Sequence, residues 1–179
     1  MIKVGDQIPS MTLTKATAEG PKPVTTDEIF KGRKVVLFAV PGAFTPTCSA
    51  KHLPGFVQNI DALKAKGVDE IVCMAVNDAF VMGAWGKDQS VGENITMLAD
   101  GSAAFTKAMG LELDLVARGL GVRSQRFAMI VQDGTGFGMG LRMKRFSMYV
   151  VDGEVKTFNL EKPGAFEVSN VETMLTQVG

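Results

Sequence analysis

The sequence carries no net charge and few of the side chains from which metal sites are built. Its nineteen basic and nineteen acidic residues cancel, so bulk electrostatics does not draw the chain to nucleic acid or to an anionic membrane. One histidine and two cysteines among 179 residues do not supply the cluster of ligands that a metal ion needs. We therefore expect no metal, no cofactor and no nucleic-acid partner, and a small neutral substrate fits this charge balance best.

Long apolar runs and targeting signals are also missing. Apolar residues make up 46% of the chain, but no run approaches the roughly 18 residues of a membrane span. Residues 1–9 lack the basic stretch, apolar region and cleavage site of a secretory signal. We expect a cytoplasmic protein without a membrane partner, in a reducing compartment where cysteines stay as thiols unless chemistry uses them. The length suits one domain over residues 1–179.

Buried strands and amphipathic helices alternate along the first two thirds of the chain. Apolar, β-rich runs at 35–40 and 71–76 flank the segment 48–66, whose apolar residues recur at spacings of three and four before a stop at Gly67. Three further elements continue the alternation: a helix at 78–89, a strand at 95–99 and a helix at 102–109. Capping-box patterns open two more helices, after Thr25 and Ser169. The alternation predicts an α/β fold with crossover helices.

Two near copies of one segment, nineteen residues apart, interrupt this pattern. Residues 119–134 and 138–153 share the frame G-x-G-x-R-x-x-R-F-x-M-x-V-x-D-G. Two short copies do not make a solenoid, so we interpret them as a local duplication at about 119–153 within one domain. The second copy continues into 154–160 as a predicted antiparallel hairpin. The first copy then adds either an extra strand or an extended loop.

Cys48 lies where a helix is expected to begin, directly after the strand at 35–40. In Thr45-Pro46-Thr47-Cys48, threonine is a favoured N-cap and proline a favoured first helical residue, which places Cys48 in the first turn. Backbone N–H groups and the helix dipole favour thiolate over thiol there, and thiolate is the nucleophile. The residues alone leave two interpretations open: a reactive thiolate, or a small apolar residue packed at a helix start.

The segment Pro41-x-x-x-Thr45-x-x-Cys48 resembles the peroxiredoxin signature. The longer string PGAFTPTCSAKHLPGF resembles the subfamily that includes the plant type II enzymes and mammalian peroxiredoxin five, and the similarity extends over nearly the whole chain. It implies a thioredoxin-like fold, with a central mixed sheet flanked by helices, and thiol-dependent reduction of hydrogen peroxide and organic hydroperoxides. It also implies that Cys48 is the peroxidatic thiolate, that the Thr45 hydroxyl bonds the sulfur and the bound peroxide, and that Pro41 shields the thiolate.

The family's active-site arginine begins a strand in an R-x-x-R-[FY] segment, which this sequence contains twice. The candidates are Arg126 in the first copy and Arg145 in the second. Spacing from the preceding helix favours Arg126, whereas continuity with the hairpin that ends at Leu160 favours Arg145. We choose Arg126 because this assignment does not require the chain to take a different path before it reaches the site, and Arg145 is the alternative. The other arginine is then a solvated surface charge.

Cys73 lies inside the apolar run at 71–76, where an inert core thiol is the default. The alternative is a resolving cysteine, because its spacing of twenty-five residues from Cys48 resembles that in the plant type II enzymes. Closing that bridge needs Cα atoms within about 7 Å and local unwinding. We expect instead that a sulfenic acid on Cys48 is reduced by an external thiol, from glutathione with glutaredoxin or from thioredoxin.

Two other functions compete with a peroxidase. A thiol-disulfide oxidoreductase of the same fold usually needs Cys-x-x-Cys, but the residues three before and three after Cys48 are Thr45 and Lys51. A catalytically impaired binding or holdase protein is the second alternative, if the duplicated segment obstructs the pocket.

The remaining distinctive side chains are expected to be structural. His52, the only histidine, lies one helical turn after Cys48, and we expect a structural or dimer-contact role for it. Trp85, Phe44 and Phe80 are candidates for core packing, apolar walls or an oligomer surface. The family resemblance implies a homodimer across the active-site face.

Overall fold

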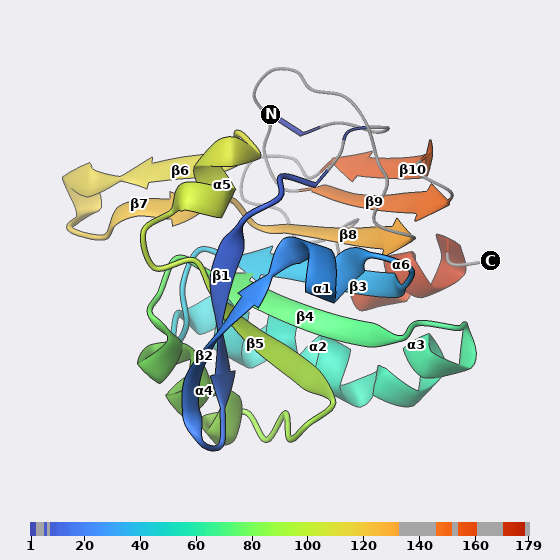
Figure 1. The fold of residues 1–179 in the computed structure, drawn as a ribbon, viewed down its shortest axis with the longest axis horizontal. Coiled ribbons are helices and arrows are strands. Elements are labelled where there is room, and N and C mark those ends of the chain that lie inside the picture. The colour runs from blue at the N-terminus through green and yellow to red at the C-terminus, as the bar shows by residue number, and fades with distance from the viewer. Residues whose placement is uncertain (3–5, 7, 133–145, 152–153, 161–169, 178–179) are drawn as a thin grey trace.

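The computed structural model describes residues 1–2, 6, 8–132, 146–151, 154–160 and 170–177. Its main feature is a sheet of eight described strands in the order β10-β9-β8-β3-β4-β5-β1-β2, beside which the small hairpin β6–β7 projects (Figure 1). β3, β4 and β5 are parallel, whereas β8 and β1 run antiparallel to β3 and β5, so the sheet is mixed.

The strands are β1 Thr12–Thr17, β2 Gly20–Thr25, β3 Lys34–Val40, β4 Glu70–Ala75, β5 Ile95–Ala99, β6 Glu112–Leu115, β7 Gly121–Ser124, β8 Phe127–Gln132, β9 Phe146–Val151 and β10 Glu154–Leu160. The helices are α1 Thr26–Phe30, the π-helical turn η1 Cys48–His52, α2 Leu53–Gln58, α3 Ile60–Ala65, α4 Ala79–Asp88, α5 Ala104–Ala108, the 3₁₀ turn η2 Val116–Arg118 and α6 Val171–Gln177.

Helices cover both faces of the sheet, and β3 contributes to the core on each side. Successive side chains of a strand point to opposite faces. On one face Val36, Phe38 and Val40 pack with residues from η1, α2, α3, α4 and α6. On the other face Val35, Leu37 and Ala39 pack with residues from α1 and α5. Burial on both faces explains why β3 has a continuous apolar sequence rather than an alternating one.

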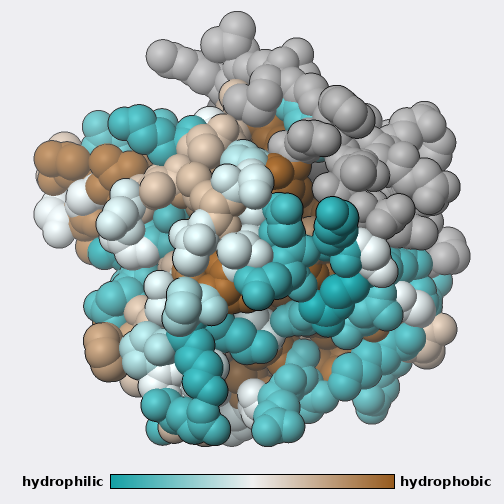
Figure 2. Space-filling model, in the orientation of Figure 1, coloured by the Kyte–Doolittle hydropathy of each residue, from teal (hydrophilic) through white to brown (hydrophobic). Residues whose placement is uncertain are grey.

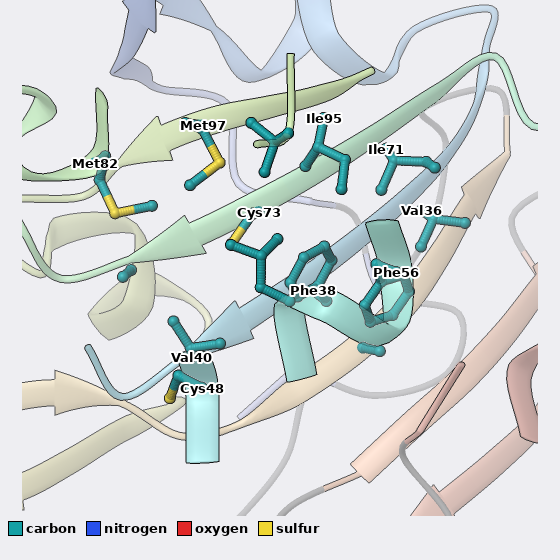
Figure 3. Packing of buried hydrophobic residues seen from close by; sticks show 14 of the residues in the cluster. Val36, Phe38, Val40, Cys48, Phe56, Ile71, Cys73, Met82, Ile95 and Met97 are labelled. Atoms are coloured by element: carbon teal, nitrogen blue, oxygen red, sulfur yellow. The ribbon is translucent and has the colours of Figure 1, made fainter. Parts of the chain in front are cut away.

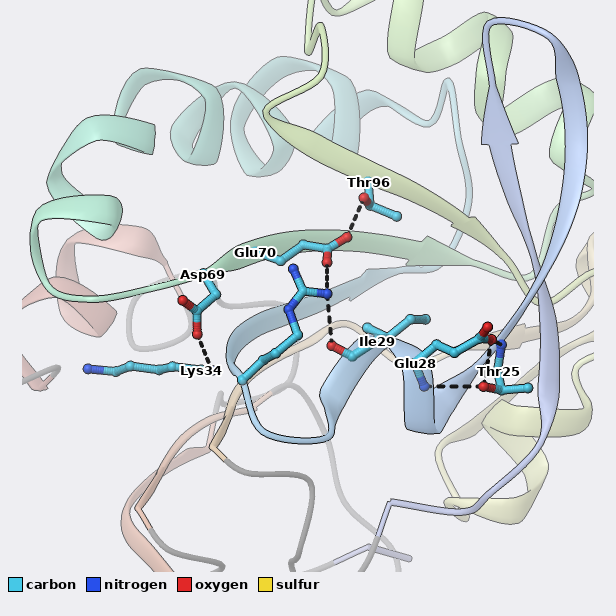
Figure 4. Close-up of polar contacts among 8 residues, drawn as sticks. Thr25, Glu28, Ile29, Lys34, Asp69, Glu70 and Thr96 are labelled. Atoms are coloured by element: carbon cyan, nitrogen blue, oxygen red, sulfur yellow. Dashed lines mark hydrogen bonds and ion pairs between the residues drawn. The ribbon is translucent and has the colours of Figure 1, made fainter.

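Polar contacts connect the first helix with the strand ends that follow it (Figure 4). Thr25 and Glu28 form the predicted capping box at the start of α1. The Glu70 carboxylate forms an ion pair with the Arg33 guanidinium, which links β4 to the loop after α1. It also accepts a hydrogen bond from the Thr96 hydroxyl, which links β4 to β5. Glu70 begins β4 and pairs with Val35 near the start of β3, so its contacts lie at the end of the sheet opposite to the carboxyl end of β3, which leads to Cys48.

The predicted strands and helices between residues 34 and 109 are confirmed with small shifts at their ends. The strand at 95–99 coincides with β5, and the helix at 78–89 is α4 with Asp78 as N-cap, whose carboxylate accepts the Val81 N–H. One expectation is wrong, because the single helix at 48–66 is interrupted at Asn59. The Asn59 side chain donates to the Gly55 carbonyl, a side-chain-to-backbone bond of the kind that competes with helix continuation.

The first turns of that helix are also irregular. The Leu53 N–H donates to the Cys48 carbonyl, five residues earlier, which makes η1 a π-helical turn. Pro54 follows at once and has no N–H to donate to Ala50, so the ordinary ladder cannot form there. Pro54 therefore disturbs the start of the helix.

The two copies of the duplicated segment supply neighbouring strands. β8 from the first copy and β9 from the second pair in parallel, with Phe127 opposite Phe146 and Met129 opposite Met148. The two residues of each pair occupy the same position in the two copies, so the strands pair with the nineteen-residue offset that separates the copies. β9 continues into the predicted antiparallel hairpin with β10. Of the two options for the first copy, the extra strand is observed.

Candidate active site around Cys48

Cys48 is held by the segment that joins β3 to the next helix. β3 ends at Val40, and the chain then turns through residues 41–45, where Phe44 has a positive φ of 59°. Non-glycine residues rarely adopt this conformation, and such strain clusters at functional sites. Pro46 and Thr47 are helical, so Cys48 lies in the first turn, as the sequence predicts.

Two hydrogen-bond donors converge on the Cys48 sulfur. Thr45 Oγ1 lies 2.8 Å and Arg126 Nη2 lies 2.9 Å from Sγ. The Cys48 side chain is 0% exposed and Arg126 is 4% exposed, so bulk water does not weaken the contact between them, whereas Thr45 is half-buried. One neutral donor and one cationic donor therefore contact the same sulfur, and hydrogen bonds from a charged donor are the stronger kind.

The Thr45 hydroxyl has a second acceptor within reach. Its oxygen also lies 2.8 Å from the Gly42 carbonyl oxygen. Because a hydroxyl carries one proton, it donates to either the sulfur or the carbonyl at a given moment and keeps lone pairs that can accept. Thr45 can therefore donate to Sγ, or it can donate to Gly42 while it accepts a hydrogen bond from a bound molecule.

Arg123 and Asn77 fix the loop that carries Thr45. The Ala43 N–H donates to Asn77 Oδ1 at 3.0 Å, and Arg123 Nη1 lies 3.5 Å from the carbonyl oxygens of both Pro41 and Val76. These contacts join the ends of β3 and β4 to β7. Sequence reasoning missed both residues, although Arg123 begins the same R-x-x-R frame that contains Arg126.

His52 lies beside the arginine, inside the protein. Its Nδ1 is 2.7 Å from Arg126 Nη1, and its side chain is 1% exposed. The ring packs against Phe38 and Phe56, with centroid distances of 5.2 and 5.6 Å. The His52 side chain is thus buried within its own chain, which fits the structural alternative in the sequence prediction better than the dimer contact.

The three aromatic residues singled out in the sequence separate into core and surface. Trp85 is fully buried and donates its indole N–H to Ser49 Oγ at 3.0 Å, which ties α4 to the turn that holds Cys48. Phe44 and Phe80 are 53% and 74% exposed. Phe44 lies in the loop after β3, Phe80 lies in the first turn of α4, and the Ala43–Asn77 hydrogen bond joins the segments that precede them.

Cys73 occupies the centre of β4, opposite Phe38 of β3 and Met97 of β5. It is fully buried, and Figure 3 shows it among apolar side chains, away from the end of β3 where Cys48 lies. Burial raises the pKa of the Cys73 thiol well above its ordinary value, and the neighbouring Cys48 adds to this rise while Arg126 opposes it. Cys73 is therefore a poor source of thiolate.

The structure thus brings Cys48, Thr45 and Arg126 into direct contact. Pro41 directly follows β3 in the same loop and is half-buried. Arg145, the alternative arginine, lies outside the described residues. Within the described part of the chain, no cluster of three His, Cys, Asp or Glu side chains could hold a metal ion. No helix in that part is long and apolar enough to cross a membrane.

Comparison with known proteins decides the family. The Redoxin family model matches residues 3–135. Peroxiredoxin-2E-2, chloroplastic, from Oryza sativa subsp. japonica is 48% identical over 179 residues, which cover 97% of this chain and 71% of that protein. The chain belongs to the peroxiredoxin family.

Two further peroxiredoxins match over almost their full length. Peroxiredoxin-2B from Arabidopsis thaliana is 42% identical, and the match covers 97% of this chain and 96% of that protein. The crystal structure of reduced Prx3 in complex with H₂O₂ from Vibrio vulnificus is 50% identical, covers 100% of both chains and has a TM-score of 0.83. The predicted thioredoxin-like α/β fold and the similarity to plant type II peroxiredoxins are therefore confirmed, and this peroxiredoxin is a thiol peroxidase.

Proposed function

We propose that Cys48 is the peroxidatic residue of this peroxiredoxin, activated by Thr45 and Arg126. The observation that carries the proposal is the convergence of two donors on one buried sulfur, at 2.8 and 2.9 Å. Attack on a peroxide leaves negative charge on the departing oxygen, and donors already fixed at the sulfur stabilise that transition state. Pro41, in the same loop, limits access of water to the thiolate.

The proposed cycle has two halves. The Cys48 thiolate attacks one oxygen of the hydroperoxide, an S–O bond forms as the O–O bond breaks, and the departing oxygen takes a proton to leave as water or an alcohol. The sulfur has then lost two electrons and is a sulfenic acid. A reductant thiol forms a mixed disulfide with Cys48 and releases water, and a second thiol restores Cys48 and leaves as a disulfide.

Hydrogen peroxide and organic hydroperoxides are the proposed substrates. The Vibrio vulnificus protein described in complex with H₂O₂ supports the first of these, because it is 50% identical over its whole chain. A small neutral peroxide also suits a sulfur that the surrounding side chains fully bury.

We propose glutathione with glutaredoxin, or thioredoxin, as the reductant, in a reducing compartment such as the cytoplasm. The decisive assay follows peroxide consumption with glutathione plus glutaredoxin and with thioredoxin in parallel. At least one system should sustain turnover at a rate proportional to enzyme. Failure of both, with peroxide still oxidising Cys48, would reject these reductants but not the peroxidatic role.

Cys73 is expected to be dispensable for turnover. Burial within β4 and the raised pKa of its thiol both oppose its attack on a sulfenic acid. We expect Cys73→Ala to consume peroxide at a rate close to wild type with an external thiol, while the free energy of unfolding falls by about 1 kcal/mol. A variant that folds but stops after one turnover would instead establish Cys73 as the resolving cysteine.

A homodimer across the active-site face is the proposed assembly. Phe44 and Phe80 are exposed beside the Cys48 loop, and Leu120 and Val122 are 43% and 40% exposed on the β6–β7 hairpin that Arg123 joins to that loop. Figure 2 shows hydrophobic surface on this projecting hairpin, at the left of the view. Several large apolar side chains exposed on neighbouring segments are typical of an interaction site.

Phe80→Glu tests that assembly, because a charge in an apolar interface must be desolvated without a partner. We expect the wild-type protein and Phe80→Leu to sediment as dimers and Phe80→Glu to sediment as a monomer at the same concentration. A wild-type monomer, or a glutamate variant that remains fully dimeric, would contradict the proposed interface.

A further inference from the structure

His52 is a buried polar residue beside Arg126, and the cycle above does not use it. It is the only histidine in the chain. Its Nδ1 meets Arg126 Nη1 at 2.7 Å, while the other terminal nitrogen of the same guanidinium, Nη2, meets Cys48 Sγ at 2.9 Å. One planar group therefore bridges the imidazole and the sulfur.

The direction of the Arg126–His52 bond follows from the donors available. A guanidinium is always protonated and has no acceptor, so Nη1–H must donate and Nδ1 must accept. His52 is then neutral, with its proton on Nε2. A protonated imidazole would offer a donor to a donor and place a second cation at hydrogen-bond distance from Arg126.

This bond also excludes one role for His52. A general base must use a nitrogen lone pair to take a proton. The Nδ1 lone pair is already engaged by Arg126, which lies between the imidazole and Cys48 through its two terminal nitrogens. His52 consequently acts on the sulfur through the arginine.

The imidazole is itself held rigidly. Phe38 and Phe56 stack on each other with a centroid distance of 4.0 Å and an interplanar angle of 6°. The His52 ring leans on both, tilted by 59° and 56°. Phe38 of β3 and Phe56 of α2 thus hold the imidazole ring of His52 in place, and the ring holds Nη1 of Arg126. Because the guanidinium is planar, fixing Nη1 also sets the direction in which Nη2 points. An arginine side chain has many rotamers to lose, so a second anchor reduces the cost of holding it at the sulfur.

We infer that His52 is a positioning residue, whose neutral, Nδ1-accepting imidazole holds the Arg126 guanidinium against Cys48. This inference rests on the proposed peroxidatic role of Cys48, and it goes beyond that role because it assigns the orientation of the arginine to a further residue, His52.

A matched pair of variants separates this role from packing. Leucine at position 52 keeps an apolar side chain of similar size but removes the acceptor, whereas asparagine places its Oδ1 near the position of Nδ1. We expect H52L to slow both peroxide reduction and the alkylation of Cys48 by iodoacetamide about tenfold, the effect of one hydrogen bond to a charged group, and H52N to restore most of that loss. Unchanged rates in H52L would overturn the inference.

A double-mutant cycle supplies the second test. If His52 acts only through Arg126, then H52L should have almost no further effect on Cys48 alkylation in an R126Q background. An equal slowing in both backgrounds would mean that His52 acts only through packing. Alkylation does not require peroxidase turnover, so these rates remain informative even if the wild-type protein consumes no peroxide.

Because the chain has one histidine, nitrogen NMR of the wild-type protein tests the bond without any substitution at position 52. Near pH 7 the spectrum should report a neutral imidazole with the proton on Nε2, and R126Q should change the Nδ1 shift. An imidazolium, or a proton on Nδ1, would contradict the inference even if H52L failed to fold.

Discussion

Cys48→Ser is expected to abolish peroxide consumption with any thiol donor. Serine is nearly isosteric, but a serine hydroxyl is a much weaker nucleophile than a cysteine sulfur, even with Thr45 and Arg126 beside it. Loss of a covalent nucleophile typically costs a thousandfold or more, so a residual rate of about 0.1% or lower is expected. Stopped-flow or coupled peroxide assays would measure it.

The serine variant should keep its fold, because Cys48 packs at a helix start without any other covalent bond. Its melting temperature should stay within a few degrees of the wild-type value, for a change of about 1 kcal/mol or less. Cys73→Ala is the matched control, since it removes the other buried thiol. A folded serine variant with wild-type turnover would refute the peroxidatic role of Cys48.

Arg126→Gln is expected to lower the rate constant for peroxide reduction by about a hundredfold to a thousandfold, the usual cost of losing one donor to a developing negative charge. Glutamine retains polar atoms but loses the charge and cannot bond Sγ and His52 together. Arg145→Gln, in the second copy of the repeat, should leave that rate constant close to wild type.

The comparison is informative because the repeat supplies two arginines in the same frame. Strand β8, which Arg126 precedes, pairs with β3, and β9 lies one strand further from it. A large effect of Arg145→Gln with a small effect of Arg126→Gln would mean that the second copy serves the site. Equal, moderate effects would mean that both copies reach Cys48.

The central strands and α4 could be predicted closely because burial on both faces leaves a clear signal. Residues of β3 and β4 read as uninterrupted apolar runs, and Asp78 marks the start of α4. The β1–β2 hairpin was missed for the opposite reason. Gly20–Thr25 contains two prolines and no fully buried residue, a composition that only an edge strand tolerates.

The site could be predicted in part. Thr45 and Cys48 are three residues apart, so the family motif and local helix geometry suffice to place them together. Arg126 contacts them from seventy-eight residues away, and its assignment needed the resemblance. His52 and Arg123 had no local pattern that reveals their partners, because each contact depends on how separate segments of the chain pack.

The most direct test of the central claim is mass spectrometry after one equivalent of hydrogen peroxide, with a sulfenic-acid trap present and no reductant. The account predicts one trapped adduct per chain, located on the peptide that contains Cys48, and an unmodified thiol at Cys73. A quantitative disulfide between Cys48 and Cys73 would contradict the single-cysteine cycle. An adduct elsewhere, with Cys48 unmodified, would contradict the claim that Cys48 is the residue that reacts with peroxide.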